Sequence, residues 1–102
     1  KAINVSNTDT AAHSIRLRSV SITSGSSSYG TNGILVKLVD VTGTVQGTIT
    51  YNGGGSWTTS GSPTAYVSLP ASTQWTIRID STLSAGVAAG VTTTIEIAVD
   101  VQ

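Results

Sequence analysis

Apolar and polar residues alternate with a period of two along most of this chain. In the segment 94–101 the odd positions are Ile or Val, and the even positions are Thr, Glu, Ala and Asp. The segment 74–80 repeats this alternation and places Trp75, Ile77 and Ile79 on one inward face. Successive side chains of a strand point to opposite faces, and no segment has the 3.6-residue period of a helix. The pattern therefore predicts an all-β protein.

A β-hairpin is predicted near the middle of the chain. The run 33–41 is densely apolar, which indicates a central strand covered on both sides. It leads through Thr42 and Gly43 into a second alternating segment at 44–51. Because glycine tolerates the positive φ of a tight hairpin turn, we expect Gly43 to occupy that position.

The segment 15–22 changes phase along its length. Ile15 and Leu17 are on odd positions, whereas the next apolar residues, Val20 and Ile22, are on even ones. One extra residue in a strand produces such a shift. The sequence therefore predicts a β-bulge near Ser19.

Two short strands and three loops rich in Gly and Ser complete the pattern. The strands are 3–5 and 65–69, the second ended by Pro70, and the loops are 24–33, 52–63 and 84–90. Seven or eight short strands with such loops predict a single β-sandwich over residues 1–102, of immunoglobulin-like or jelly-roll type. A chain of 102 residues is long enough for one domain.

Charge and cysteine content argue against several function classes. The formal net charge is zero and 10% of residues are charged, so we expect neither nucleic acid nor anionic lipid as a partner. Without cysteine there is no disulfide or thiol chemistry. No apolar run reaches the roughly 20 residues of a membrane helix, so we expect no membrane insertion. Ser and Thr make up 32 residues, a bias common in secreted and surface-exposed β proteins.

No catalytic or metal-binding constellation stands out. His13 is the one histidine and no Gly-X-Ser-X-Gly elbow accompanies it, so we expect an exposed residue at a strand start. Asp40, Asp80 and Asp100 fall near predicted strand ends, where a carboxylate hydrogen-bonds turn amides or solvates an edge. The glycine-rich stretch 52–57 lacks the Lys and the helix of a phosphate-binding loop. We expect no enzymatic activity and no cofactor.

The aromatic residues divide into a core anchor and a loop group. Trp75 lies on the inward face of its strand and is the expected anchor. Trp57 lies in a glycine-rich loop, six residues after Tyr51. Such a Trp stacks on a sugar ring, contacts a neighbouring subunit or folds back over the core, and the sequence leaves all three open. Asn4 begins an Asn-Val-Ser triplet that fits the N-glycosylation pattern, and its phase places it toward solvent.

Both ends of the chain are predicted strands. The chain begins at Lys1 and contains no methionine, so we expect a processed chain, by removal of a leader or by trimming of a domain. Exposed terminal strands carry unpaired backbone groups that invite pairing. In one interpretation both strands lie in the chain's own sheets. In the other, residues 1–10 form a strand that is donated to a neighbouring copy, and repetition builds a filament.

Two stretches resemble a known group of proteins. The stretch 3–17, Ile-Asn-Val-Ser-Asn-Thr-Asp-Thr-Ala-Ala-His-Ser-Ile-Arg-Leu, resembles the opening of secreted sandwich domains. The stretch 84–97, Ser-Ala-Gly-Val-Ala-Ala-Gly-Val-Thr-Thr-Thr-Ile-Glu-Ile, resembles their small-residue loop before the last strand. Both are similar to TasA-like and other donor-strand pilus subunits. The resemblance implies a leader-processed sandwich that polymerises into extracellular fibres.

The leading hypothesis is a structural subunit of an extracellular filament. Ile3 and Val5 would enter a neighbour's groove, and Tyr29, Tyr51 and Trp57 would make lateral contacts. This hypothesis predicts a large apolar patch or an open edge on an isolated subunit. The alternatives are a monomeric carbohydrate-binding or adhesin module, with Trp57 and a Tyr in line on a flat face, and a viral decoration or tail protein that forms a closed oligomer.

Overall fold

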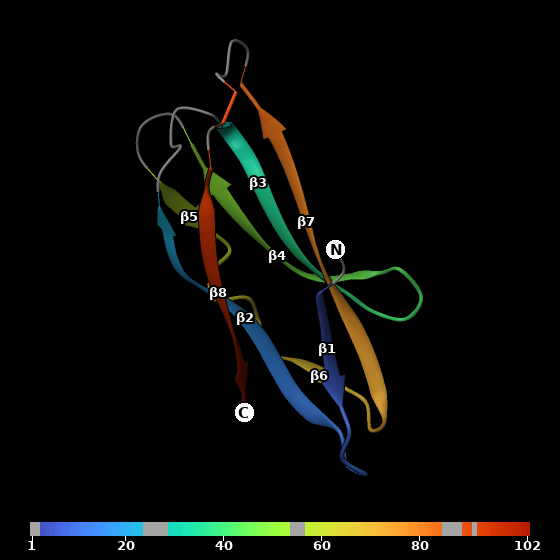
Figure 1. The fold of residues 1–102 in the computed structure, drawn as a ribbon. Coiled ribbons are helices and arrows are strands. Elements are labelled where there is room, and N and C mark those ends of the chain that lie inside the picture. Colours follow the sequence, from blue (N-terminus) through green and yellow to red (C-terminus); the bar gives the residue numbers. More distant parts are fainter. Residues whose placement is uncertain (1–2, 24–28, 54–56, 85–88, 91) are drawn as a thin grey trace.

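The computed structural model describes residues 3–23, 29–53, 57–84, 89–90 and 92–102, which form two antiparallel β-sheets packed face to face (Figure 1). The body is elongated, with extents of 49 × 22 × 19 Å. No helix occurs among these residues. The predicted all-β sandwich is confirmed, and eight strands are described where seven or eight were expected.

The two sheets differ in width. The larger has five strands in the order β1-β7-β3-β4-β5, and the smaller has three in the order β6-β2-β8. The strands of the larger sheet are β1 (Ile3–Asn7), β7 (Thr73–Leu83), β3 (Tyr29–Val39), β4 (Val45–Asn52) and β5 (Thr58–Ser60). Those of the smaller sheet are β6 (Val67–Leu69), β2 (His13–Thr23) and β8 (Thr94–Val101).

The central strand pairs match those of an immunoglobulin sandwich, but the first and last strands each lie in the opposite sheet from the one they join in that fold. In an immunoglobulin sandwich strand B pairs with E and C with F, while the first strand lies beside B and the last beside F. Here β2 pairs with β6 and β3 with β7, which reproduces the two central pairs. The last strand, β8, lies beside β2, and the first strand, β1, lies beside β7. Both terminal strands are therefore edge strands, in different sheets.

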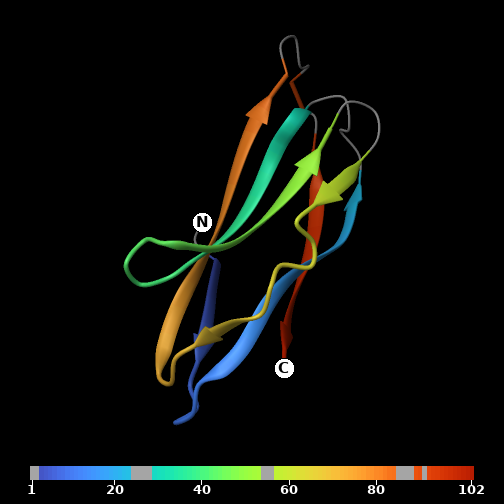
Figure 2. The same ribbon diagram turned by 180° about the vertical axis from the view of Figure 1, so that it is seen from behind.

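The predicted hairpin and bulge are confirmed. β3 and β4 form an antiparallel hairpin whose turn includes Gly43 at a φ of 84°, and Figure 2 shows it projecting from the body. The pairing of β2 with β8 shifts register between Ser19 and Ser21. The strand expected at 65–69 is shorter, since β6 begins at Val67 and Ala65 is exposed.

The core lies between the facing sheets. Trp75 is 5% exposed, which confirms it as a core anchor. The other core residues are Ile15, Leu17, Ile34, Val36, Leu38, Ile49, Tyr51, Leu69 and Ile77. They come from strands of both sheets, and burying each large apolar side chain contributes roughly 1.5–3 kcal/mol.

The central strand β3 is covered on one face only, which corrects the expectation of cover on both. Its inward residues Ile34, Val36 and Leu38 are buried against the smaller sheet. Leu35 and Lys37 on the other face are half-buried, because no further layer lies over them among the described residues. The dense apolar run reflects a position in the middle of an antiparallel sheet.

Candidate functional site

Five inward-pointing apolar side chains are exposed on strands at one side of the sandwich. They are Ile3, Ile79, Leu83, Val99 and Val101, and their exposed fractions range from 36% to 63%. Each lies on the same sheet face as a buried residue of its own strand or of the strand paired with it. Ile3, for example, is opposite the buried Ile77, and Val99 is opposite the buried Leu17. We call this set the open side.

The open side follows from the unequal width of the sheets. A strand face is buried only where the opposite sheet covers it, and the three-stranded sheet does not cover all five strands of the other. Ile79 shares the face of Trp75 and Ile77, as predicted, yet it is 42% exposed because the smaller sheet does not cover it. Inward-facing apolar side chains that the opposite sheet leaves uncovered are candidates for contact with another chain.

Part of the β7 edge lacks a partner strand on this side. β1 pairs with β7 only from Ile3 opposite Ile77 to Asn7 opposite Thr73. The remaining segment of β7, 78–83, pairs with β3 on its other edge and with no second strand in the described part of the chain. Backbone groups along such an edge are available for an added strand.

A groove lies between the edge strands β1 and β8 at this side. Its volume is about 160 Å³, and its lining consists of Val5, Ser6, Asn7, His13, Ile15, Leu69, Val99 and Val101. Five of these eight lining residues are apolar, as expected of a site for the alternate side chains of a β-strand.

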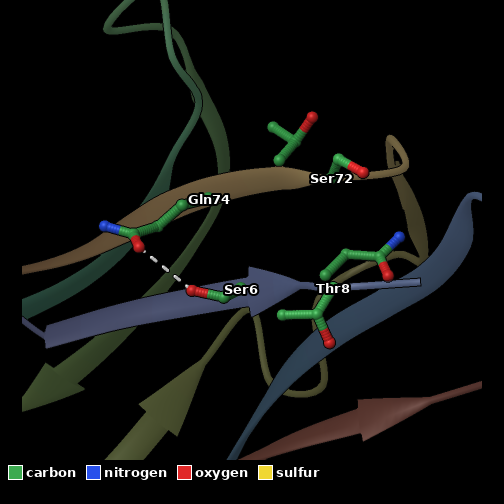
Figure 3. A pocket seen from close by; sticks show the side chains of 6 residues that line it. Ser6, Thr8, Ser72 and Gln74 are labelled. Atoms are coloured by element: carbon green, nitrogen blue, oxygen red, sulfur yellow. Dashed lines mark hydrogen bonds between the residues drawn. The ribbon is translucent and has the colours of Figure 1, made fainter. Parts of the chain in front are cut away.

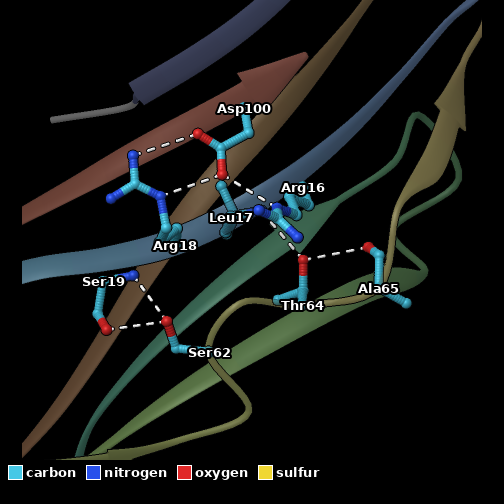
Figure 4. A network of polar contacts seen from close by, with 8 residues as sticks. All are labelled: Arg16, Leu17, Arg18, Ser19, Ser62, Thr64, Ala65 and Asp100. Carbon is cyan, nitrogen blue, oxygen red and sulfur yellow. Dashed lines mark hydrogen bonds and ion pairs between the residues drawn. The ribbon is translucent and has the colours of Figure 1, made fainter. Parts of the chain in front are cut away.

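The opposite side of the sandwich is closed by the connection between β5 and β6. Thr64 accepts a hydrogen bond from Leu17 N at its Oγ1 atom (3.0 Å) and donates its own amide to Leu17 O (2.9 Å). Ser19 N donates to Ser62 Oγ at 2.8 Å (Figure 4). These residues satisfy the backbone of β2 at the edge that β6 does not reach.

β1 is held in its own sheet. Ile3 is partly exposed at the open side, whereas Val5 is half-buried against the core. Asn7 is 8% exposed, and its Nδ2 donates to the carbonyl oxygens of Ala11 (2.9 Å), Leu69 (3.2 Å) and Pro70 (3.1 Å). The interpretation in which both terminal strands lie in the chain's own sheets describes this subunit.

A polar pocket lies on the outer surface where β1 ends and β7 begins (Figure 3). Its volume is about 400 Å³, and it is lined by Ser6, Asn7, Thr8, Ser72, Thr73 and Gln74. Ser6 Oγ donates to Gln74 Oε1 at 3.1 Å across the two strands. The amide of Asn7 is already fully engaged, so the pocket has no buried group in need of a ligand.

The aromatic residues form a cluster at the end of the core. Trp57 folds back over the core, with its ring centroid 5.8 Å from that of Tyr29 and 6.5 Å from that of Tyr51. Tyr51 is 1% exposed, so the expectation that it makes lateral contacts is wrong. Tyr29 and Trp57 are half-buried. Asn4 is exposed, as its phase predicted.

All four cationic side chains in the described residues belong to two similar clusters. Arg16 Nε and Arg18 Nε lie 3.0 Å and 3.1 Å from Asp100 Oδ2 (Figure 4). Lys37 Nζ and Arg78 Nε lie 3.0 Å and 3.4 Å from Asp80 Oδ2. Hydrogen bonds from Arg18 and Arg16 lower the pKa of Asp100, and that from Lys37 lowers the pKa of Asp80. Of the two roles expected for these carboxylates, that of bonding turn amides is wrong, because both carboxylates bind cations. Asp100 does lie on an edge strand, β8, as the other role requires.

Asp40 and Asp9 organise turns. Asp40 Oδ1 accepts from the amides of Thr42 (2.9 Å) and Thr44 (3.0 Å), as predicted. Hydrogen bonds from Thr42 and Gln46 lower the pKa of Asp40 to about 2. Asp9 Oδ2 lies 2.8 Å from His13 Nε2, and this contact lowers the pKa of Asp9.

No three His, Asp or Glu side chains of the described residues gather as metal ligands. None of the described segments is a helix long and apolar enough to cross a membrane. No family model, curated protein or solved structure matches the chain.

Proposed function

We propose that this chain is a structural subunit of an extracellular filament, assembled by donation of strand β1 to a neighbouring copy, so that neighbouring subunits pack against each other's open sides. The observation that carries this proposal is the exposure of inward-pointing apolar side chains on the edge strands β1 and β8 and on β7 beside them. A sandwich with such a side gains buried area when a neighbouring subunit packs against it. Ordinary sandwiches instead protect their edges with charge or proline.

The donated segment is the β1 strand of a neighbouring copy. β1 has five residues and lies at a sheet edge, so it shares its strand pairing with β7 alone. The β1 strand of a neighbour can replace the subunit's own β1 on β7 in the same register. Its Ile3 and Val5 then lie opposite Ile77 and Trp75. The turn at 8–12 is the hinge. Exchange of an identical element costs little, and a head-to-tail contact that does not close on itself continues into a filament.

Composition supports an assembly of identical subunits outside the cell. The net charge is zero and Ser and Thr are abundant, so copies stack without strong mutual repulsion. In each charge cluster two cations share one carboxylate, so each cluster keeps a small net positive charge, and the whole chain stays neutral.

A cysteine pair across β1 and β7 tests this exchange. Asn4 and Thr76 are direct partners on the exposed face, and the chain contains no cysteine of its own. Opposite Cβ atoms in an antiparallel pair lie about 4.5–5.5 Å apart, close to disulfide geometry. Two samples of the double variant Asn4→Cys/Thr76→Cys are compared, one oxidised before it is concentrated and one oxidised after. Light scattering measures polymer size, and non-reducing gels show whether the disulfides lie within one chain or between chains.

The expected result is a disulfide-linked ladder from polymers oxidised after assembly, and a linked monomer when oxidation comes first. Polymers whose disulfides all lie within one chain would show that β1 remains paired with β7 of its own subunit, which contradicts strand donation. A chain that stays monomeric at every concentration contradicts the filament itself. A fixed small oligomer would instead favour the closed assembly of a decoration protein.

A further inference from the structure

A third hollow, distinct from the groove and the polar pocket described above, lies at the closed side of the sandwich, beside the bulge of β2. It is lined by Ser19, Val20, Ser21, Ile22, Tyr51, Trp57 and Thr59, and its volume is about 360 Å³. This volume lies within the range of small-molecule sites. The lining comes from β2, β4 and β5 and from Trp57, directly before β5, so both sheets contribute to it.

Two residues of this lining have buried polar atoms that find no hydrogen-bond partner in the described part of the chain. They are Oη of Tyr51 and Nε1 of Trp57. Burial raises the pKa of the Tyr51 phenol, and an interaction with the Ser19 hydroxyl opposes that rise, although Tyr51 Oη and Ser19 Oγ do not meet the geometry of a hydrogen bond. A buried donor left unpaired costs about 1–3 kcal/mol, so two in one hollow call for an acceptor.

The remaining lining is neutral and rich in hydroxyls. Ser19 Oγ donates to Ser62 Oγ at 2.8 Å and lies 3.4 Å from Thr59 Oγ1. Among the described residues no charged side chain lines the hollow, and Glu96 accepts a hydrogen bond from the lining residue Ser21 through its Oγ at 3.3 Å. Such a site suits a neutral ligand with several oxygen acceptors.

An added peptide strand fits this place poorly. The backbone of Leu17 and Ser19 is already paired with Thr64 and Ser62, so that part of the β2 edge is occupied. The groups that remain are side-chain donors at the bulge, and bulges commonly aim side chains into functional sites.

We propose that this hollow binds a single neutral saccharide unit, whose hydroxyl oxygens accept hydrogen bonds from Tyr51 Oη and Trp57 Nε1. Ser21 and Thr59 contact the rim of the sugar, and the indole packs against its C–H groups. The inference is independent of strand donation, because the open side lies elsewhere on the subunit.

The test is a titration of the ¹⁵N-labelled full chain with D-glucose, D-galactose and N-acetylglucosamine, each alone. Trp57 and Trp75 are the two tryptophans, so the spectrum has two indole N–H signals. Trp75 is a core residue and serves as the internal control. We expect the Trp57 indole signal to shift and saturate with at least one sugar while the Trp75 signal stays in place.

The variant Tyr51→Phe tests whether the Tyr51 hydroxyl donates a hydrogen bond to the ligand or instead stabilises the fold. Removal of an unpaired buried hydroxyl should leave Tm unchanged or higher, while sugar affinity falls about tenfold, the effect of one lost hydrogen bond. Tyr66→Phe on the exposed Tyr66 is the matched control, and we expect its affinity to be unchanged. Thr59→Ala, at an exposed rim position, gives a second variant whose folding is not at risk.

Three results would overturn the proposal. The first is a Trp57 signal that no sugar moves. The second is an equal affinity of the wild type, Tyr51→Phe and Thr59→Ala. The third is a clear fall in Tm for Tyr51→Phe without change in binding, because the hydroxyl would then be satisfied within the fold. A shift caused only by a peptide of residues 3–7 would assign the hollow to a strand.

Discussion

Asn7 on β1 donates a hydrogen bond to the carbonyl oxygen of Leu69 on β6 at 3.2 Å. The two residues are 62 positions apart and belong to edge strands of different sheets. Asn7 Oδ1 also accepts from Asp9 N at 3.0 Å, at the start of the turn that leads to β2. One buried amide thus fixes the end of β1, the turn after it and the smaller sheet.

The variant Asn7→Ala should lower the free energy of unfolding by about 1–3 kcal/mol, because it leaves partly buried carbonyl groups without a donor. Urea unfolding measures this change. Asn4→Ala is the matched control on the same strand, since Asn4 is exposed, and should stay within about 0.5 kcal/mol of the wild type. Equal effects of the two variants would show that Asn7 does not clamp β1.

The variant Val101→Lys should suppress polymer formation while the subunit stays folded. Val101 is 63% exposed on the open side, so a lysine there finds solvent in the monomer but loses water when a neighbouring subunit packs against it. Light scattering against concentration gives the result. Val41→Lys is the control, because Val41 is 73% exposed in the β3–β4 turn. If both variants polymerise like the wild type, the open side is not the interface.

Leucine-to-alanine changes should distinguish the core from the open side. Leu17 is fully buried and Leu83 is 60% exposed. We expect Leu17→Ala to cost about 2–5 kcal/mol in unfolding free energy, through lost burial and a cavity. Leu83→Ala should cost less than about 1 kcal/mol in the monomer, since its side chain is already largely in water. Thermal unfolding of dilute monomers compares the two, and a large loss for Leu83→Ala would mean that the open side is covered.

Asp40 should make the fold weaker in acid. Its pKa of about 2 in the fold lies below the ordinary 3.8, so the ionised carboxylate stabilises the fold above about pH 4, and this stabilisation is lost as pH falls through about 2. Asp40→Asn should therefore be less stable than the wild type near neutral pH, and the difference should vanish near pH 2. Urea midpoints of the wild type and of Asp40→Asn are compared at several pH values. The other carboxyl groups with lowered pKa values are present in both proteins, so their contributions cancel in the difference. A difference that is constant with pH would contradict this role.

Local pattern predicted much of the fold. The period of two indicated the strands and their inward faces, Gly43 indicated the hairpin turn, and the phase change near Ser19 indicated the bulge. Tyr51 could also have been assigned to the core, because it lies two residues after Ile49 on the same face of β4. These features depend on neighbours within one strand or hairpin.

The open side and the ion pairs could not be predicted in this way. Whether Ile79 or Val101 is buried depends on the width of the opposite sheet, which no single strand encodes. The contact of Arg16 with Asp100 joins residues 84 positions apart and depends on the register of two strands. Val99 and Val101 are exposed because the strand order β6-β2-β8 places β8 at the edge of the smaller sheet.

The position of the last strand has a practical consequence for handling this protein. Gln102 N donates to Ser14 O at 2.9 Å, directly after Val101 on the open side. A tag fused there would start beside the groove. A fluorophore is better attached through a Val41→Cys variant, because Val41 is 73% exposed in the hairpin that projects away from the body in Figure 2 and the contacts of Asp40 in this turn are kept.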